Sequence, residues 1–98
     1  MSGRNLYLVA YDIRNPKRLR NIHKALLGFG DPLQFSVFQC ALTAAERQGM
    51  ITAVTEIIHQ KEDRVLIVDM GPQEGRGPGT MQVLGLQEVP RKGGPIVL

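Results

Sequence analysis

Short apolar segments alternate along this chain with segments that have helical periodicity. Residues 6–11 are almost all apolar, and they are followed by Asp12 and by the turn-like sequence of residues 14–16. A short apolar run that ends in turn residues is typical of a buried strand. Residues 65–68 form a second run of this kind, so we expect two buried strands that lie far apart in the sequence.

Two segments predict amphipathic helices. Apolar residues recur on one stripe of Pro16–Phe29 and basic residues on the opposite stripe, and Asn15 suits the N-cap position. Thr43 is expected to cap the second helix, because Glu46 three residues later completes a capping box. This second helix is expected to fray near Gln60. Both helices can therefore bury one face against a sheet.

The remaining segments predict shorter strands and a linker. Residues 33–42 alternate between two faces, but the segment is long for one strand. We expect a bend or bulge near Ser36 that divides it into a short strand and a longer one. Residues 71–80 are rich in glycine and proline and predict a linker, and residues 81–86 have the composition of one more strand.

The order of strand, helix, strand pair, helix and strand is typical of a split βαβ unit. We therefore predict an α+β fold of the ferredoxin-like class, with an antiparallel sheet and both helices on one face. Residues 1–70 would form the core, residues 71–80 the linker, and residues 81–98 a C-terminal strand and tail. A second copy of the chain could cover the free face of the sheet, with each tail packing on its partner subunit.

Charge is distributed unevenly along the sequence. The formal net charge is +3, and residues 1–30 hold six basic side chains, while Asp12 is their only acidic one. A basic surface on a small domain indicates a polyanionic partner, most often nucleic acid, although a solvated basic helix face is the simpler alternative. The single cysteine, Cys40, excludes an intrachain disulfide bond. The sequence has no membrane-spanning run and no secretory leader, so we expect a soluble cytoplasmic protein.

Asp12 is the main candidate for chemistry, because strand ends are where rigid scaffolds commonly present reactive groups. A single carboxylate can hold Mg²⁺ when water and phosphate oxygens complete the coordination sphere, and two Asp12 side chains in a dimer could share one ion. Alternatively, Asp12 caps the local turn or pairs with Arg14. The candidates for phosphate contacts are the basic residues near it: Arg14, Lys17, Arg18, Arg20 and Lys24.

Three further residues lie close to Asp12 in the predicted fold. Tyr11 and Phe38 are expected either to stack near Asp12 or, more simply, to belong to the core or to a dimer interface. Ser36 is expected to satisfy a bend in its strand, since no Ser-His-Asp arrangement is present. Neither histidine has metal-ligand spacing with Cys40, so neither is expected to take part in chemistry.

Three segments together resemble the CRISPR-associated Cas2 family. They are residues 8–13 with the Tyr-Asp strand end, residues 18–20 on the first helix, and residues 33–43 with the sequence Gln-Phe-Ser-Val-Phe. The resemblance extends over about residues 5–70. It implies a ferredoxin-like homodimer in which the C-terminal strand of each subunit pairs with the sheet of the other.

The same resemblance implies roles for individual residues. Asp12 would be a divalent-metal ligand, with supporting roles for Tyr11, Arg18, Arg20 and Phe38 and with Ser36 shaping its strand. Members of the family are described as metal-dependent endonucleases on RNA or double-stranded DNA. They also form the centre of the spacer-acquisition complex, in which the dimer holds a protospacer duplex and the Cas1 integrase is the catalyst. Some members have a basic residue where this chain has Pro32, which weakens the case for nuclease activity more than the case for scaffolding.

Three functions follow as alternatives. In the first, a Mg²⁺-dependent endonuclease, Asp12 from two subunits holds the ion while Arg18 and Arg20 stabilise developing negative charge. In the second, a non-catalytic dimeric scaffold, basic helix faces hold the phosphates of a duplex for the Cas1 integrase. In the third, a small-molecule sensor, the dimer groove binds a metabolite. Binding that weakens steeply with salt would support the first two, and Asp12→Asn would separate them.

Overall fold

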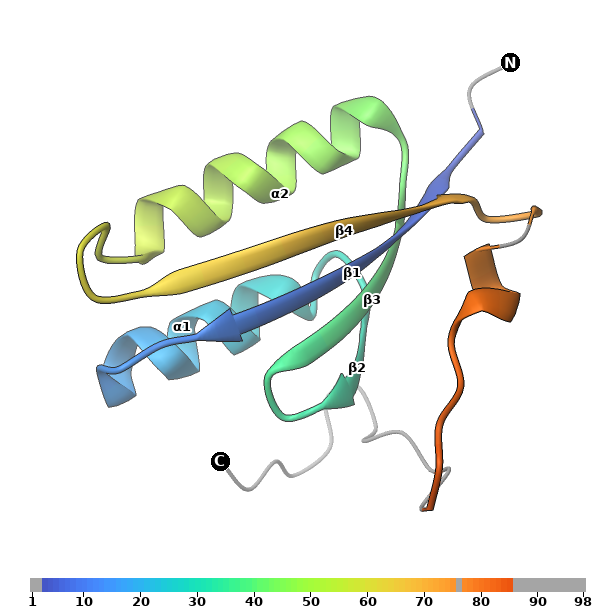
Figure 1. The fold of residues 1–98 in the computed structure, drawn as a ribbon. Coiled ribbons are helices and arrows are strands. Elements are labelled where there is room, and N and C mark those ends of the chain that lie inside the picture. The colour runs from blue at the N-terminus through green and yellow to red at the C-terminus, as the bar shows by residue number, and fades with distance from the viewer. Residues whose placement is uncertain (1–2, 76, 86–98) are drawn as a thin grey trace.

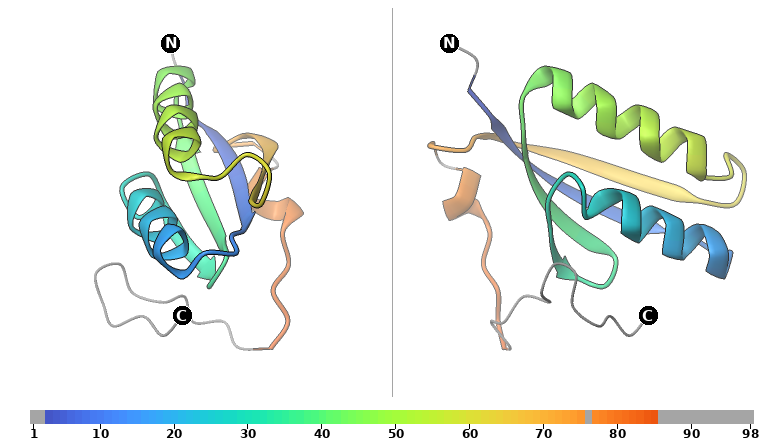
Figure 2. Two further views of the ribbon diagram at one scale, coloured as in Figure 1. Left: turned by 90° about the vertical axis from the view of Figure 1, so that its left-hand side faces the viewer. Right: turned by 180° about the vertical axis from the view of Figure 1, so that it is seen from behind.

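An antiparallel sheet of four strands carries both α-helices on one face (Figures 1 and 2). The computed structural model describes residues 3–75 and 77–85. Strand order in the sheet is β2-β3-β1-β4. The elements are β1 (Asn5–Asp12), α1 (Pro16–Leu26), β2 (Asp31–Gln34), β3 (Val37–Leu42), α2 (Ala44–Ile57), β4 (Arg64–Pro72) and a short 3₁₀ turn, η1 (Gly77–Thr80). This βαββαβ connectivity confirms the predicted α+β class and is that of a ferredoxin-like fold.

Both helices begin where the sequence indicated. The side chain of Asn15 accepts hydrogen bonds from the backbone N–H groups of Lys17 and Arg18 at 2.9 and 3.0 Å. Thr43 and Glu46 form the expected capping box at the start of α2. The predicted ends of the helices were too late, because α1 stops at Leu26 and α2 stops at Ile57. After Leu26 the chain continues in hydrogen-bonded turns, in which each backbone N–H group donates to a carbonyl three or four residues earlier.

The predicted bend near Ser36 is confirmed. Phe35 and Ser36 form a tight turn between β2 and β3, and β3 then pairs with β1 in register from Val37 opposite Ala10. This turn lies beside the C-terminal end of β1, because the backbone N–H of Tyr11 donates to the carbonyl of Ser36 at 3.0 Å.

Strand β4 is longer than the apolar run of residues 65–68 predicted. It pairs with β1 along its length, from Arg64 opposite Asp12 to Pro72 opposite Asn5, and so continues past Val68. In this extension, the carboxylate of Asp69 accepts a hydrogen bond of 3.2 Å from the side chain of Asn5. Pairing with a neighbouring strand therefore decided where this strand ends.

The expected C-terminal strand is only partly described. Residues 81–85 lie outside any strand in this single chain, and residues 86–98 fall outside the described part. The pairing of this tail with a second subunit therefore stays a prediction. None of the helices in the described ranges is long and apolar enough to cross a lipid bilayer.

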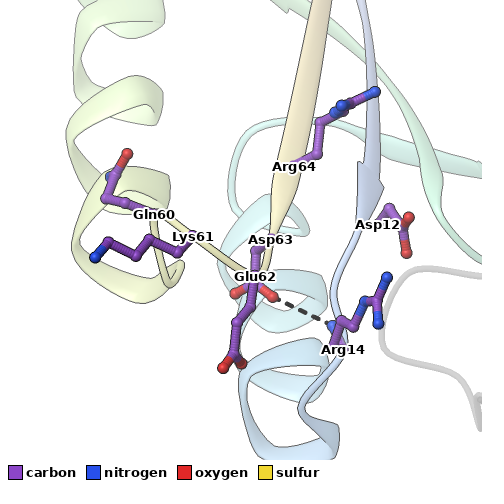
Figure 3. Close-up of a pocket in the computed structure, with 7 residues that line it drawn as sticks. All are labelled: Asp12, Arg14, Gln60, Lys61, Glu62, Asp63 and Arg64. Carbon is purple, nitrogen blue, oxygen red and sulfur yellow. Dashed lines mark hydrogen bonds between the residues drawn. The ribbon is translucent and has the colours of Figure 1, made fainter.

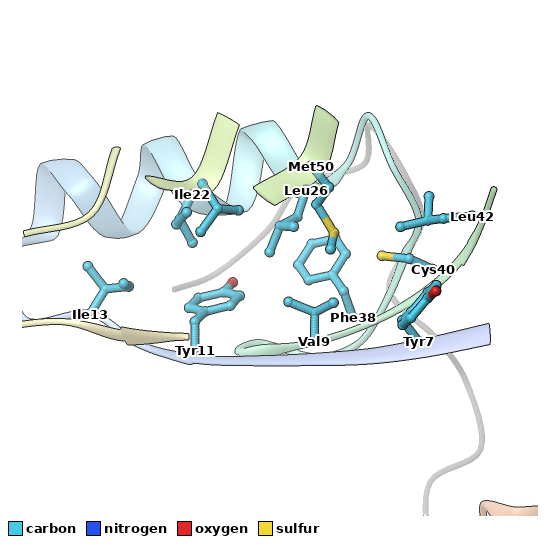
Figure 4. Close-up of a cluster of buried hydrophobic side chains, with 11 residues drawn as sticks. Tyr7, Val9, Tyr11, Ile13, Ile22, Leu26, Phe38, Cys40, Leu42 and Met50 are labelled. Atoms are coloured by element: carbon cyan, nitrogen blue, oxygen red, sulfur yellow. The ribbon is translucent and has the colours of Figure 1, made fainter. Parts of the chain in front are cut away.

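The core fills the space between the sheet and the two helices (Figure 4). Its buried members are Tyr7, Val9, Tyr11, Ile13, Ile22, Leu26, Phe38, Cys40, Leu42, Met50 and Val54. Within residues 3–75 and 77–85 no α-helix covers the opposite sheet face, and on it Leu66 and Val68 remain 56% and 40% exposed. Side chains alternate between the two faces of a strand, so Asp12 lies on the uncovered face together with Leu8 and Ala10 of β1.

Candidate nucleic-acid interface

Asp12 is the last residue of β1, and its side chain is exposed. It lies directly opposite Arg64, the first residue of β4. Together with the α2–β4 loop, these strand ends form an open polar groove of about 490 Å³ (Figure 3). The groove is lined by Asp12, Arg14, Gln60, Lys61, Glu62, Asp63 and Arg64. The groove thus contains three cationic side chains besides the exposed carboxylate of Asp12.

Asp63 connects the two loops beside this groove through its hydrogen bonds. Its side chain is fully buried and accepts hydrogen bonds from the backbone N–H groups of His59, at 2.8 Å, and Arg14, at 3.2 Å. It also accepts a bond of 2.7 Å from Nε of Arg18. The pKa of the Asp63 carboxyl is held far below its usual value, first by the bond from Arg18 and then by the two backbone donors. Asp63 therefore stays ionised and joins the β1–α1 loop to the α2–β4 loop.

The guanidinium group of Arg18 forms ion pairs within the single chain. Besides Asp63, its guanidinium group contacts Glu62 at 2.9 Å, and these two carboxylates raise its pKa. Its charge is thus compensated within the fold. Sequence reasoning proposed Arg18 for a site role but missed Asp63, because the two residues are 45 positions apart and an acidic residue before a strand is an ordinary feature.

The outer face of α1 is basic, as the helical pattern indicated. Lys17, Arg20 and Lys24 are exposed, whereas Ile22 and Leu26 are buried on the opposite side. None of these three cations forms an ion pair within residues 3–75 and 77–85. Exposed cations of this kind remain available to bind phosphate oxygens.

Tyr11 and Phe38 lie in the core, which was the simpler of the two alternatives for them. Their ring centroids are 6.3 Å apart, and the ring of His23 packs edge-on against Phe38 at 5.1 Å. The hydroxyl of Tyr11 donates a hydrogen bond of 2.6 Å to the carbonyl of Phe35. Tyr11 thus donates hydrogen bonds to the β2–β3 turn from both its backbone and its side chain. The side chain of Ser36, on the same turn, is exposed.

The carboxylates near Asp12 contribute little to a metal site within one chain. Asp63 and Glu62 are bonded to Arg18, and the described residues contain no group of three histidine, cysteine or acidic side chains that could hold an ion. Asp12 forms no ion pair with the rest of the described chain, so it is the free oxygen donor. Mg²⁺ accepts one or two carboxylates when waters and phosphates supply the other ligands, so Asp12 fits such an ion as a shared ligand.

Comparison with known proteins identifies relatives of this chain. The family model of CRISPR associated protein Cas2 matches residues 5–75. A protein of Geobacter sulfurreducens named CRISPR-associated endoribonuclease Cas2 is 49% identical over 74 residues, which cover 76% of this chain and 78% of that protein. A protein of Rhodospirillum rubrum with the name CRISPR-associated endoribonuclease Cas2 1 is 41% identical over 73 residues, covering 74% and 72% of the two chains.

Solved structures agree with the sequence comparison. Streptococcus pyogenes Cas2 superposes with a TM-score of 0.72 at 32% identity, covering 82% of this chain and 99% of that one. A hypothetical protein from Thermus thermophilus gives a TM-score of 0.73 at 28% identity, covering 91% of this chain and 98% of that one. The matched region contains β1 with Asp12, the basic helix α1 and the β2–β3 turn. This chain therefore belongs to the CRISPR-associated Cas2 family.

Proposed function

We propose that this protein is a metal-dependent endonuclease in CRISPR spacer acquisition, in which Asp12 from each subunit of a homodimer is a ligand of Mg²⁺. The observation that carries this proposal is the exposed Asp12 carboxylate, which has no ion pair with any other described residue although cations line its groove. A carboxylate without an ion pair, in a groove that also contains cationic side chains, suits a site that receives both a metal ion and a phosphate.

Within this proposal, each residue in or near the groove has a separate role. When bound, a divalent ion at Asp12 supplies positive charge that polarises the scissile phosphate and activates water. Arg14 and Arg64 flank Asp12 and attract the phosphate of the substrate, and Arg14 points toward Asp12 in Figure 3. Arg18, paired with Asp63, keeps the two loops of the groove in position. Arg20 is exposed on α1 but does not line the groove, so it suits a contact with substrate phosphates outside the groove rather than with developing charge at Asp12.

The uncovered sheet face supports a homodimer. Leu66 and Val68 are exposed there, and Asp12 lies on the same face at the end of β1. Burial of this apolar surface against a second copy would remove it from water and would also bring the two Asp12 side chains to the same interface.

A second candidate function is a non-catalytic dimeric scaffold that holds a protospacer duplex for the Cas1 integrase. The compensated charge of Arg18 favours it, because a guanidinium already bonded to two carboxylates is a poor partner for a developing negative charge. The exposed cations of α1 suit the phosphates of a duplex in either case. The third hypothesis, a small-molecule sensor, gains no support from a groove this open and polar, since small-molecule pockets are concave and mostly apolar.

The two candidates are separated by cleavage of labelled duplex DNA and single-stranded RNA with Mg²⁺. Wild type, Asp12→Asn and the control Asp31→Asn, an exposed aspartate on β2, are purified identically so that a contaminating nuclease acts equally in all three. Activity that disappears only in Asp12→Asn supports the endonuclease, and its preferred substrate then identifies the nucleic acid. Equal activity or equal inactivity in all three proteins rejects the endonuclease. Retained or tighter duplex binding by Asp12→Asn then supports the scaffold.

A further inference from the structure

Phe35 is the aromatic residue that the fold leaves exposed. Its side chain is 57% exposed, although an aromatic ring normally gains stability by burial. All five aromatic residues of the sequence lie in the described part, and the other four are buried or pack against the core: Tyr7, Tyr11, Phe29 and Phe38. The hydrophobic core therefore does not account for the phenylalanine at this position.

The backbone of Phe35 is held firmly. Its carbonyl accepts the 2.6 Å bond from the hydroxyl of Tyr11, and that hydroxyl also contacts Nδ1 of the buried His23 at 3.1 Å. The next carbonyl, that of Ser36, accepts the 3.0 Å bond from the backbone of Tyr11. Because hydrogen bonds already order the backbone of this turn, little backbone entropy is lost when a ligand packs on the Phe35 ring. Less of the favourable contact energy is then offset by ordering of the loop.

The two sequence neighbours of Phe35 are polar and uncharged. Gln34 and Ser36, on either side of Phe35, are exposed and carry an amide and a hydroxyl group. An aromatic face with neighbouring hydrogen-bonding groups is the arrangement by which proteins bind unpaired bases. The turn is bonded to Tyr11, the residue that directly precedes Asp12, so the ring and the groove lie at the same end of β1.

We propose that Phe35 is a stacking platform for an unpaired nucleobase, with Gln34 and Ser36 able to bond to the edges of that base. The proposal rests on the nucleic-acid binding proposed above and refines its substrate class. Bases inside a perfect duplex are already stacked on each other, so the ring contributes only to a single strand, a frayed end or an overhang. The exposed aliphatic residues Leu66 and Val68 lie on the sheet face and cannot replace it, because they lack an aromatic face.

The test uses the full chain and a single-stranded RNA that carries a fluorescent adenine analogue, whose emission falls when the base stacks. The proteins are wild type, Phe35→Ala, Phe35→Trp and the control Gln48→Ala, which removes an exposed side chain of α2 that has no role in the proposal. Wild type and Phe35→Trp should quench the analogue and bind the strand. Phe35→Ala should leave the emission unchanged and bind the strand roughly 5- to 160-fold more weakly, which is the range expected for loss of one stacked base.

A blunt DNA duplex and the mass of each protein in solution complete the experiment. Duplex affinity should change less than about two-fold in Phe35→Ala, because the phosphate contacts remain. Equal loss of duplex and single-strand binding, unchanged single-strand binding, or a change from dimer to monomer in Phe35→Ala would each overturn the inference, the last by placing Phe35 in a subunit interface. If wild type binds neither nucleic acid, the proposed function fails as well. If wild type binds both and only the effect of Phe35→Ala is absent, the inference alone fails.

Discussion

Tyr11 and His23 share a hydrogen bond of 3.1 Å inside the core. The Tyr11 hydroxyl has one hydrogen, which it donates to the carbonyl of Phe35, so Nδ1 of His23 must be the donor to Tyr11. The other ring nitrogen, Nε2, is then a buried acceptor that has no hydrogen-bond partner in residues 3–75 and 77–85. Protonation of His23 would place an N–H without an acceptor in the core, which is costly. The fold therefore holds this imidazole neutral.

Stability should consequently decrease in mild acid. Burial lowers the pKa of His23 below its ordinary value of 6.5, while burial raises the pKa of Tyr11 to about 12, so the phenol stays protonated. As the pH falls through about 6.5, the unfolded chain takes up a proton that the folded chain does not, and the free energy of unfolding decreases. Urea denaturation between about pH 5 and 7.5 measures this slope.

His23→Leu should flatten this dependence, because the group that titrates differently in the two states is removed. His59, the other histidine of the sequence, is exposed and provides the matched control His59→Gln, which should retain the slope of wild type. A wild-type stability that stays constant over this range would show that His23 accepts a proton in the folded state as readily as in the unfolded state.

Asp63→Asn should destabilise the protein and loosen the groove. The amide is neutral, so Arg18 loses its main partner, and an amide has one oxygen for the several donors that the carboxylate accepts. We expect the Tm to fall by roughly 5 °C or more. Glu62→Gln is the control, since Glu62 is the exposed partner of Arg18 and exposed ion pairs contribute little. Equal Tm values for the two variants would contradict the central role of Asp63.

The same substitution should change the response to acid. The lowered pKa of Asp63 means that its contribution is complete above the unfolded value of about 3.9 and is lost as the pH falls below it. Asp63→Asn lacks this loss, so the difference in Tm between wild type and the variant should shrink in strong acid. A difference that is independent of pH would indicate that hydrogen bonding alone, and not the charge, matters at this position.

Gly30→Ala should destabilise the fold, whereas Gly49→Ala should not. A methyl group at Gly30 would collide with the carbonyl oxygen of Gln39 and approach Sγ of Cys40 to 2.6 Å, so β3 would have to shift at a cost of about 1–3 kcal/mol. At Gly49 the nearest atom is 3.9 Å away on Phe29, and alanine in a helix is favoured over glycine by about 0.5–1 kcal/mol. Thermal denaturation should therefore move in opposite directions for the two variants.

Removal of the α1 cations should reduce the salt dependence of duplex binding. Lys17, Arg20 and Lys24 are exposed, and a cation that no longer neutralises a phosphate lowers the slope of log affinity against log salt by about 0.9. Single and combined substitutions by glutamine are titrated with duplex DNA at several salt concentrations. Arg47→Gln is the control, because the Arg47 guanidinium on α2 packs 5.5 Å from the ring centroid of Tyr7. A slope that Arg47→Gln alone reduces would place the duplex on the other helix.

The features that could be predicted from the sequence are local ones. The cap at Asn15, the capping box from Thr43 to Glu46 and the turn at Ser36 each depend on residues within a few positions of one another. Errors arose at element ends, as in β4, where pairing with β1 extended the strand beyond Val68. Local pattern carries no information about a strand that is stabilised by residues about 60 positions away.

The sequence by itself determined the order of helices and strands, the basic face of α1 and the position of Asp12 at a strand end, because periodicity and turn residues express these directly. Only the tertiary structure decided which charges are free. The fold joins Arg18 to Asp63 across 45 positions, buries His23 against Tyr11 and leaves Phe35 exposed. Burial and ion pairing depend on which segments contact each other in the folded protein, and the packing of the whole chain determines those contacts.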